Sequence, residues 1–209
     1  MRGDEADEPI EGPAFVAGSA VLSRAFELAA EAHAGQRVAG GDEPYLRHPL
    51  EVAELLHREG AGEAVVAAAM LHDAVEDGGL TIARVEAEFG ARVAALVRAL
   101  TDDPAIQDWV ARKDALRAQV RAAGPDAVAI YAADKLANLR RMRRLYAEHG
   151  EDAIRLSKAP TLDARVAAWR ADAALAGELG PELGFRGELE AGLDEFERER
   201  RARLSANST

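Results

Sequence analysis

Apolar residues recur at spacings of three and four along most of the chain, which is the pattern of amphipathic helices. A first helix is predicted from a cap at Ser19 or Ser23 to about Gly35, with an apolar face of Val21, Leu22, Ala25, Phe26, Ala29 and Ala30. Further helices are predicted at residues 48–60, 61–76, from 81, at 91–100, 106–123, 125–148, 152–158, 161–179 and 181–204. No segment alternates long enough for a strand. The pattern therefore predicts an all-α fold, a single helical bundle of roughly eight to ten helices.

The segments between and beyond these helices set the expected domain limits. Residues 1–17 are acidic and broken by Pro and Gly, so we expect a disordered tail. Residues 18–180 are predicted to form the domain, and the Gly-rich stretch 37–45 a loop within it. The charged helix at 181–204, with a thin apolar stripe, is expected to pack on the domain or meet a partner chain. Residues 205–209 form a short tail.

Composition narrows the class of partner. The 209 residues include 37 acidic and 26 basic side chains, a net charge of −11, which disfavours binding to nucleic acid or anionic membranes. No apolar run approaches the roughly 18 residues of a membrane span, and no secretory signal opens the chain. The absence of Cys excludes thiolate metal sites, disulfides and Cys nucleophiles. We expect a cytoplasmic protein acting on a small molecule, either monomeric or as a homo-oligomer.

The first candidate for chemistry is the segment LHDAVED at the end of the most apolar helix. Its ionisable side chains are His72, Asp73, Glu76 and Asp77, and one-turn spacing gathers them on one polar face. Charges on a buried helix need a partner or a metal, and a divalent cation would neutralise two carboxylates. The alternative is a solvated helix terminus.

Two other polar residues occur in unusual surroundings. His48 follows the Gly-rich loop and precedes Pro49 at the start of a helix, where a capping or surface role is the alternative. Asp134 lies within the apolar face of a helix and needs a partner, for which Lys135 or Arg141 would suffice.

Five ordered motifs resemble the HD superfamily of metal-dependent phosphohydrolases, in particular the hydrolase domain of RelA/SpoT proteins and their small stand-alone relatives. They are AxxAHxGQ at 29–36, PYxxHPxxVA at 44–53, AAxLHDxxED at 68–77, FGxxVxxLVxxLTDD at 89–103 and ADKLxNLR at 133–140. Together they span more than half of the chain, and the ordered set is far more specific than any single motif.

The resemblance implies a ligand set for one divalent metal: His48, His72, Asp73 and Asp134. Two imidazoles and two carboxylates suit Mn²⁺ best, with Zn²⁺, Fe²⁺ or Co²⁺ as alternatives. The resemblance also implies that Glu76 and Asp77 position or deprotonate a metal-activated water. Expected substrate contacts are Asn138 to the nucleoside and Arg37, Lys135 and above all Arg140 to phosphates.

The implied reaction is hydrolysis of the 3′-pyrophosphate of the alarmone (p)ppGpp, giving GDP or GTP and pyrophosphate. The chain departs from the family at Val38 and Ala39, where an Arg-Lys pair usually grips phosphates, and at Tyr131, which replaces a basic residue. Each change removes a charge-assisted contact. The alternatives are therefore an HD phosphatase or phosphodiesterase for a different, less charged nucleotide, and a non-catalytic nucleotide-sensing module.

Overall fold

The computed structural model describes residues 10–180 and 182–206. Within these residues the chain forms nine α-helices and one 3₁₀ helix, and the one β pairing is an isolated bridge between Arg37 and Pro44. The expected all-α class is confirmed. The elements in chain order are α1 (Ala14–Ala17), α2 (Ala20–Ala32), α3 (Arg47–Arg58), α4 (Glu63–Leu71), α5 (Ile82–Leu100), α6 (Trp109–Ala123), α7 (Pro125–His149), η1 (Gly150–Leu156), α8 (Leu162–Leu179) and α9 (Arg186–Ala206).

Short polar residues start four of the helices. In each case a side-chain oxygen accepts a hydrogen bond from the backbone N–H three residues later, which satisfies one of the unpaired donors of the first turn. The capping residues are Ser19 for α2, Thr81 for α5, Asp108 for α6 and Thr161 for α8. Of the two caps expected for α2, the structure uses Ser19.

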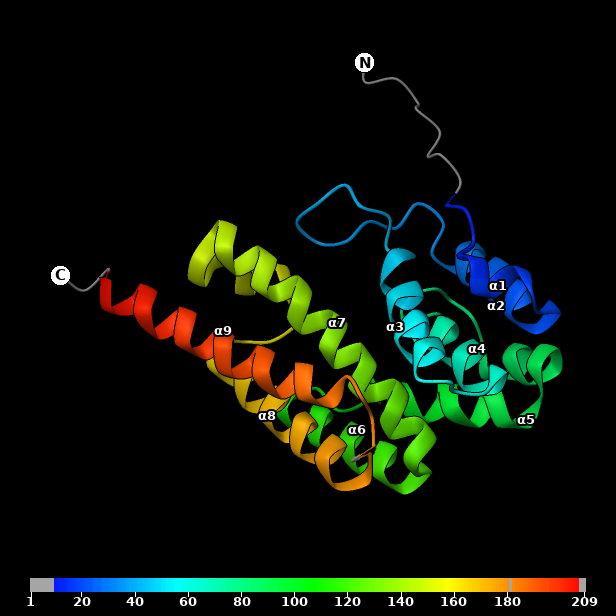
Figure 1. Cartoon of the computed structure of the whole chain (residues 1–209). Coiled ribbons are helices and arrows are strands. Elements are labelled where there is room, and N and C mark those ends of the chain that lie inside the picture. Colours follow the sequence, from blue (N-terminus) through cyan, green and yellow to red (C-terminus); the bar gives the residue numbers. More distant parts are fainter. Residues whose placement is uncertain (1–9, 181, 207–209) are drawn as a thin grey trace, which may run out of the picture.

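Helix α7 is the central element of the fold (Figure 1). It contacts α3, α4 and α5 on one side and α6, α8, α9 and η1 on the other. Its residues from Tyr131 to Ala137 are all buried, including Asp134 and Lys135. A polar pair at this depth must be matched to other groups, so the middle of α7 is where chemistry is expected.

The charged helix α9 packs on the domain through its apolar stripe. Leu189, Leu193 and Phe196 are fully buried. The Phe196 ring lies 5.3 Å from that of Tyr146 on α7 and 6.2 Å from that of Trp169 on α8, both edge to face. This aromatic contact joins the three helices. None of the helices in the described part of the chain has the length and apolar character needed to cross a membrane.

The helix predicted for residues 61–76 ends early, at Leu71. The ring Nδ1 of His72 lies 2.7 Å from the carbonyl oxygen of Ala69 and takes the place of a backbone donor there. Residues 72–77 continue as turns, in which the N–H of Asp77 still donates to the carbonyl of Asp73. The polar segment is thus a turn held on the end of α4 rather than a further helical face.

Other boundaries differ for local reasons. The two helical segments expected on either side of Gly90 are present: they meet within α5 at a kink, where Gly90 has a non-helical φ of 82° that is accessible to glycine at little cost. Part of the predicted tail is ordered, because α1 buries Val16 against the core. Residues 1–9 of that tail and 207–209 of the other lie outside the described residues. The last helix begins at Arg186 rather than at residue 181.

Candidate metal centre and its cavity

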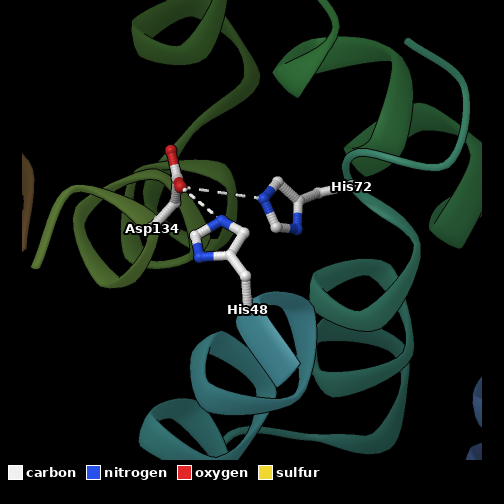
Figure 2. A group of neighbouring side chains, drawn as sticks. All are labelled: His48, His72 and Asp134. Carbon is white, nitrogen blue, oxygen red and sulfur yellow. Dashed lines mark ion pairs between the residues drawn. The ribbon is translucent and has the colours of Figure 1, made fainter. Parts of the chain in front are cut away.

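Three side chains from separate parts of the chain converge in the interior (Figure 2). His48 stands in the first turn of α3, His72 directly follows α4, and Asp134 lies midway along α7. Oδ1 of Asp134 is 3.1 Å from Nε2 of His48 and 3.8 Å from Nε2 of His72. All three atoms lie within 4.8 Å of one another, as ligands of one ion must.

Asp73 faces the same group from its edge. Its Oδ2 lies 3.3 Å from Nε2 of His72 and 3.5 Å from Nε2 of His48, and it accepts a hydrogen bond of 2.5 Å from the Tyr45 hydroxyl. Burial raises the pKa of Asp73, but the charges of His72 and His48 outweigh it and leave that pKa lowered. The carboxylate is therefore ionised and available to a cation.

The orientation of His72 fits a metal ligand. Because Nδ1 faces the carbonyl of Ala69, the other ring nitrogen points toward the carboxylates. That Nε2 is buried and has no hydrogen-bond partner among the described residues. Burial lowers the pKa of His72, whereas the charges of Asp73 and Asp134 raise it, to about 9. A proton thus occupies the position that a cation would take, and the donor set of two imidazoles and two carboxylates fits a divalent metal.

Asp134 is held by two neighbours on α7. Nζ of Lys135 lies 2.5 Å from Oδ2, and Nδ2 of Asn138 donates to Oδ1 over 2.5 Å. Lys135 is itself buried, 4.1 Å above the centre of the Tyr131 ring. Burial raises the pKa of Asp134, but the charge of Lys135 and the two histidines hold it well below its usual range. Lys135 and Asn138, predicted as substrate contacts, thus touch a ligand candidate, and both also line the cavity described below.

Glu76 and Asp77 differ in their surroundings. Oε1 of Glu76 accepts a hydrogen bond from the backbone N–H of Asp102. Burial raises the pKa of Glu76, and the charges of Asp102 and Asp73 add to this. Both oxygens of Asp77 instead lie 3.0 Å from Nζ of Lys158. One carboxylate is available with an increased proton affinity, while the other is neutralised by an ion pair.

All of these groups border one cavity of about 460 Å³. Its size is in the range of pockets that take small organic ligands. Despite the negative net charge of the chain, many basic side chains line it: Arg47, Lys113, Lys135, Arg141, Arg144, Arg155, Lys158 and Arg165. Val38 and Ala39 of the 37–45 loop form part of the wall.

Two of the residues expected to contact phosphates lie elsewhere. Arg140 pairs with Glu51 on α3 and Glu188 on α9 and is not among the cavity residues. The physical reason is helical spacing: positions four and seven after Asp134 share its face of α7, whereas the sixth points away. Arg37 is also absent from the cavity wall and donates to the carbonyl of Asp42 within its own loop.

The residues on the cavity side are Arg141 and Arg165. The spacing of seven from Asp134 would have identified Arg141 from the sequence. Arg165 on α8 lies thirty-one positions after Asp134 and outside any of the motifs. No local pattern identifies it, since the packing of α8 on α6 and α7 brings it to the cavity.

Comparisons with known proteins agree with this geometry. Residues 25–159 match the HD domain family, and this range includes all four ligand candidates. The human guanosine-3′,5′-bis(diphosphate) 3′-pyrophosphohydrolase MESH1 is 40% identical over 129 residues, which cover 60% of this chain and 72% of that protein. A solved structure described as a metazoan ortholog of SpoT that hydrolyzes ppGpp superposes with a TM-score of 0.65 at 30% identity, covering 87% of this chain and 96% of that one.

A longer relative matches as well. A probable GTP pyrophosphokinase of Mycobacterium leprae is 39% identical over 128 residues, so this chain spans 16% of the length of that protein. The class of protein is thus an all-α fold in which His and Asp side chains that could hold a metal ion converge at a basic cavity. This chain belongs to the HD domain family.

Proposed function

We propose that this chain is a metal-dependent hydrolase that removes the 3′-pyrophosphate of guanosine 3′,5′-bis(diphosphate), leaving GDP and pyrophosphate. The observation that carries the proposal is the convergence of His48, His72 and Asp134 within 4.8 Å in the wall of a basic cavity. The name of the human relative supports the choice of substrate, because the match with this chain covers 72% of that protein. GTP would be the product from the pentaphosphate form.

His48, His72, Asp73 and Asp134 are the proposed ligands, and Mn²⁺ is the proposed ion because nitrogen and oxygen donors are mixed. Such an ion would polarise phosphoryl oxygens and make water more acidic. The ligands themselves are positioned by the protein: Tyr45 donates to Asp73, and Lys135 and Asn138 hold Asp134. These contacts keep the carboxylates from turning away when the substrate enters.

Glu76 is the proposed proton acceptor for the attacking water. One of its oxygens is fixed by the N–H of Asp102, which leaves Oε2 to take a proton. Its raised pKa makes it a better base, since catalytic groups work best with a pKa nearer to neutrality. Asp77, predicted for the same role, is proposed to position Lys158 at the cavity instead.

A second function is favoured by one observation, the apolar Val38 and Ala39 in the cavity wall. These two side chains offer no charge to a phosphate. Their lack of charge would therefore cost a less charged nucleotide less binding affinity than it costs an alarmone. An HD phosphatase or phosphodiesterase for such a nucleotide is therefore the second candidate. A non-catalytic sensing module is the third candidate, and such a module would have no use for a carboxylate of raised pKa at Glu76.

A nucleotide panel tests these proposals. The full chain loaded with Mn²⁺ is incubated with ppGpp and with other nucleotides, and the products are separated by ion-exchange chromatography. We expect GDP and intact pyrophosphate from ppGpp. Orthophosphate or a monophosphate from another nucleotide, with ppGpp unchanged, would favour the second candidate. Binding without turnover of any nucleotide would favour the third. A cytoplasmic location stays a prediction from the sequence, and the sequence leaves both a monomer and a homo-oligomer open.

A further inference from the structure

Most cations at the cavity are matched by a carboxylate. Lys113 pairs with Asp102, Lys135 with Asp134, Lys158 with Asp77, Arg47 with Glu43 and Arg155 with Asp152. These pairs account for the charge of most of the basic wall. Arg144 is exposed, so water satisfies its charge.

Arg141 and Arg165 are different, because they are partly buried and form no ion pair with a carboxylate in the described part of the chain. Arg141 uses Nη2 to donate to the carbonyl oxygen of Ala39 over 2.6 Å. Arg165 uses Nη2 to donate to Oγ of Ser157 over 2.8 Å. In each, the Nε–H is buried and has no hydrogen-bond partner among the described residues. A buried unpaired donor on a charged group is costly and calls for a ligand.

The positive charge of Arg141 also acts on Arg165. Burial lowers the pKa of Arg165, the negative charge of Asp134 opposes this, and the positive charge of Arg141 lowers it further. Burial is likewise the main cause of the lowered pKa of Arg141. Both side chains line the same cavity as the metal-ligand cluster. Two cations in one cavity repel each other, and a bound anion would offset that cost.

The structure holds both side chains in place before any ligand arrives. The Arg165 guanidinium lies 5.1 Å from the centre of the Trp109 ring and 5.4 Å from that of Trp169. Arg141 is tied to a loop whose next residue, Gly40, is in close contact with Leu156; a Cβ there would lie 2.6 Å from Cδ1 of that leucine. Fixed guanidinium groups lose little entropy on binding, and their planar donors match phosphate oxygens.

We propose that Arg141 and Arg165 form an anion subsite for a phosphate of the substrate other than the one attacked at the metal centre. The inference rests on the proposed function for the identity of the substrate, but the subsite itself requires only an anion. Its ligand is either the outer phosphate of the 3′-pyrophosphate, which is transferred to water while the 3′ oxygen of GDP leaves, or the 5′-diphosphate at the other end of the nucleotide. The subsite compensates for the uncharged Val38 and Ala39 with cations from α7 and α8.

The first test uses inorganic pyrophosphate and the full chain after removal of metal by chelation. Isothermal titration calorimetry at neutral pH is expected to show binding that weakens by about tenfold or more in both R141Q and R165Q. The matched control is R155Q, which removes an exposed cavity cation already paired with Asp152 and is expected to leave the affinity within about twofold. No binding to the wild type, or equal affinities in all variants, would overturn the subsite.

R165Q could fail to fold because the side chain packs between two tryptophans, so circular dichroism is recorded for each variant. In that case pyrophosphate affinity is compared between the wild type, R141Q and R165K. R165K keeps the positive charge but loses the planar guanidinium donors. Weakening in either of these supports the subsite. Wild-type affinity in both would overturn it.

Kinetics of the Mn²⁺-loaded enzyme identify which phosphate is held. If R165Q raises KM for ppGpp and keeps kcat, the subsite holds the non-reacting 5′-diphosphate. If kcat falls, it holds the outer phosphate of the 3′-pyrophosphate, the group that is transferred to water in the reacting step. Unchanged kcat and KM in both R141Q and R165Q would overturn the inference. The calorimetry needs no turnover, so the subsite and the proposed function can fail separately. If R141Q and R165Q weaken pyrophosphate binding but the wild type does not hydrolyse ppGpp, the proposed function is overturned and the subsite stands.

Discussion

Nζ of Lys135 lies 2.5 Å from Oδ2 of Asp134, the residue before it in α7, and both side chains are buried. Successive residues on a helix point about 100° apart, so this pair does not follow from helical spacing. Lys135 places a positive charge behind a carboxylate whose other oxygen faces His48 and His72. The pair therefore balances the buried charge of the cluster when no metal is bound.

Replacing Lys135 with Met should destabilise the metal-free protein by about 3–5 kcal/mol, because one member of a buried pair is removed. Thermal unfolding followed by circular dichroism would show a lower Tm, and saturating Mn²⁺ should recover part of the loss by taking over the missing charge. The control is Lys158→Met, which breaks an exposed pair with Asp77 and should cost no more than about 1 kcal/mol. Equal Tm values for the two variants would contradict the role of Lys135.

Replacing a proposed ligand should remove the metal. His72→Ala and Asp134→Asn are each expected to weaken Mn²⁺ binding by at least about tenfold to a hundredfold in calorimetry and to abolish turnover of ppGpp. His57→Ala is the control, since His57 stacks on Phe15 away from the cavity and should leave both properties unchanged. Full metal binding in Asp134→Asn would show that the cluster is not the metal site.

The affinity for metal should rise with pH up to about 9. His72 has a pKa of about 9 in the metal-free protein, so it is protonated at neutral pH, and a metal must displace that proton. Above about pH 9 the proton no longer competes with Mn²⁺ for His72. Below that pH, each drop of one pH unit should weaken Mn²⁺ binding by about tenfold. Titrations of Mn²⁺ in two buffers with different ionisation enthalpies would measure the released proton. Binding that does not change between neutral pH and 9 would contradict the raised pKa of His72 in the metal-free protein.

Glu76→Gln should keep the metal but lose about a hundredfold to ten-thousandfold in kcat, because the amide cannot accept a proton. Calorimetry with Mn²⁺ and kinetics with ppGpp separate the two effects. Glu43→Gln is the matched control, because Glu43 also borders the cavity but pairs with Arg47 at the surface. Wild-type turnover by Glu76→Gln would remove Glu76 from the mechanism.

The helices were predictable because their signals are local. Ser19 and Thr81 cap helices in the structure as the sequence indicates, and Gly90 interrupts α5 between the two predicted segments. The end of α4 was misjudged by five residues, since the contact between the His72 ring and the carbonyl of Ala69 that ends it is made by a side chain with no regular spacing.

By itself the sequence determined the all-α class and, through residue types in ordered motifs, the candidates His48, His72, Asp73 and Asp134. Only the tertiary structure decided that Arg165 on α8 reaches the cavity, and which carboxylates the cations meet: Arg140 pairs with Glu51 and Glu188 on two other helices, while Arg141 and Arg165 pair with no carboxylate in the described part of the chain. The physical reason is that helix formation and capping depend on neighbours in sequence, whereas the partner of a charge depends on which helices pack together.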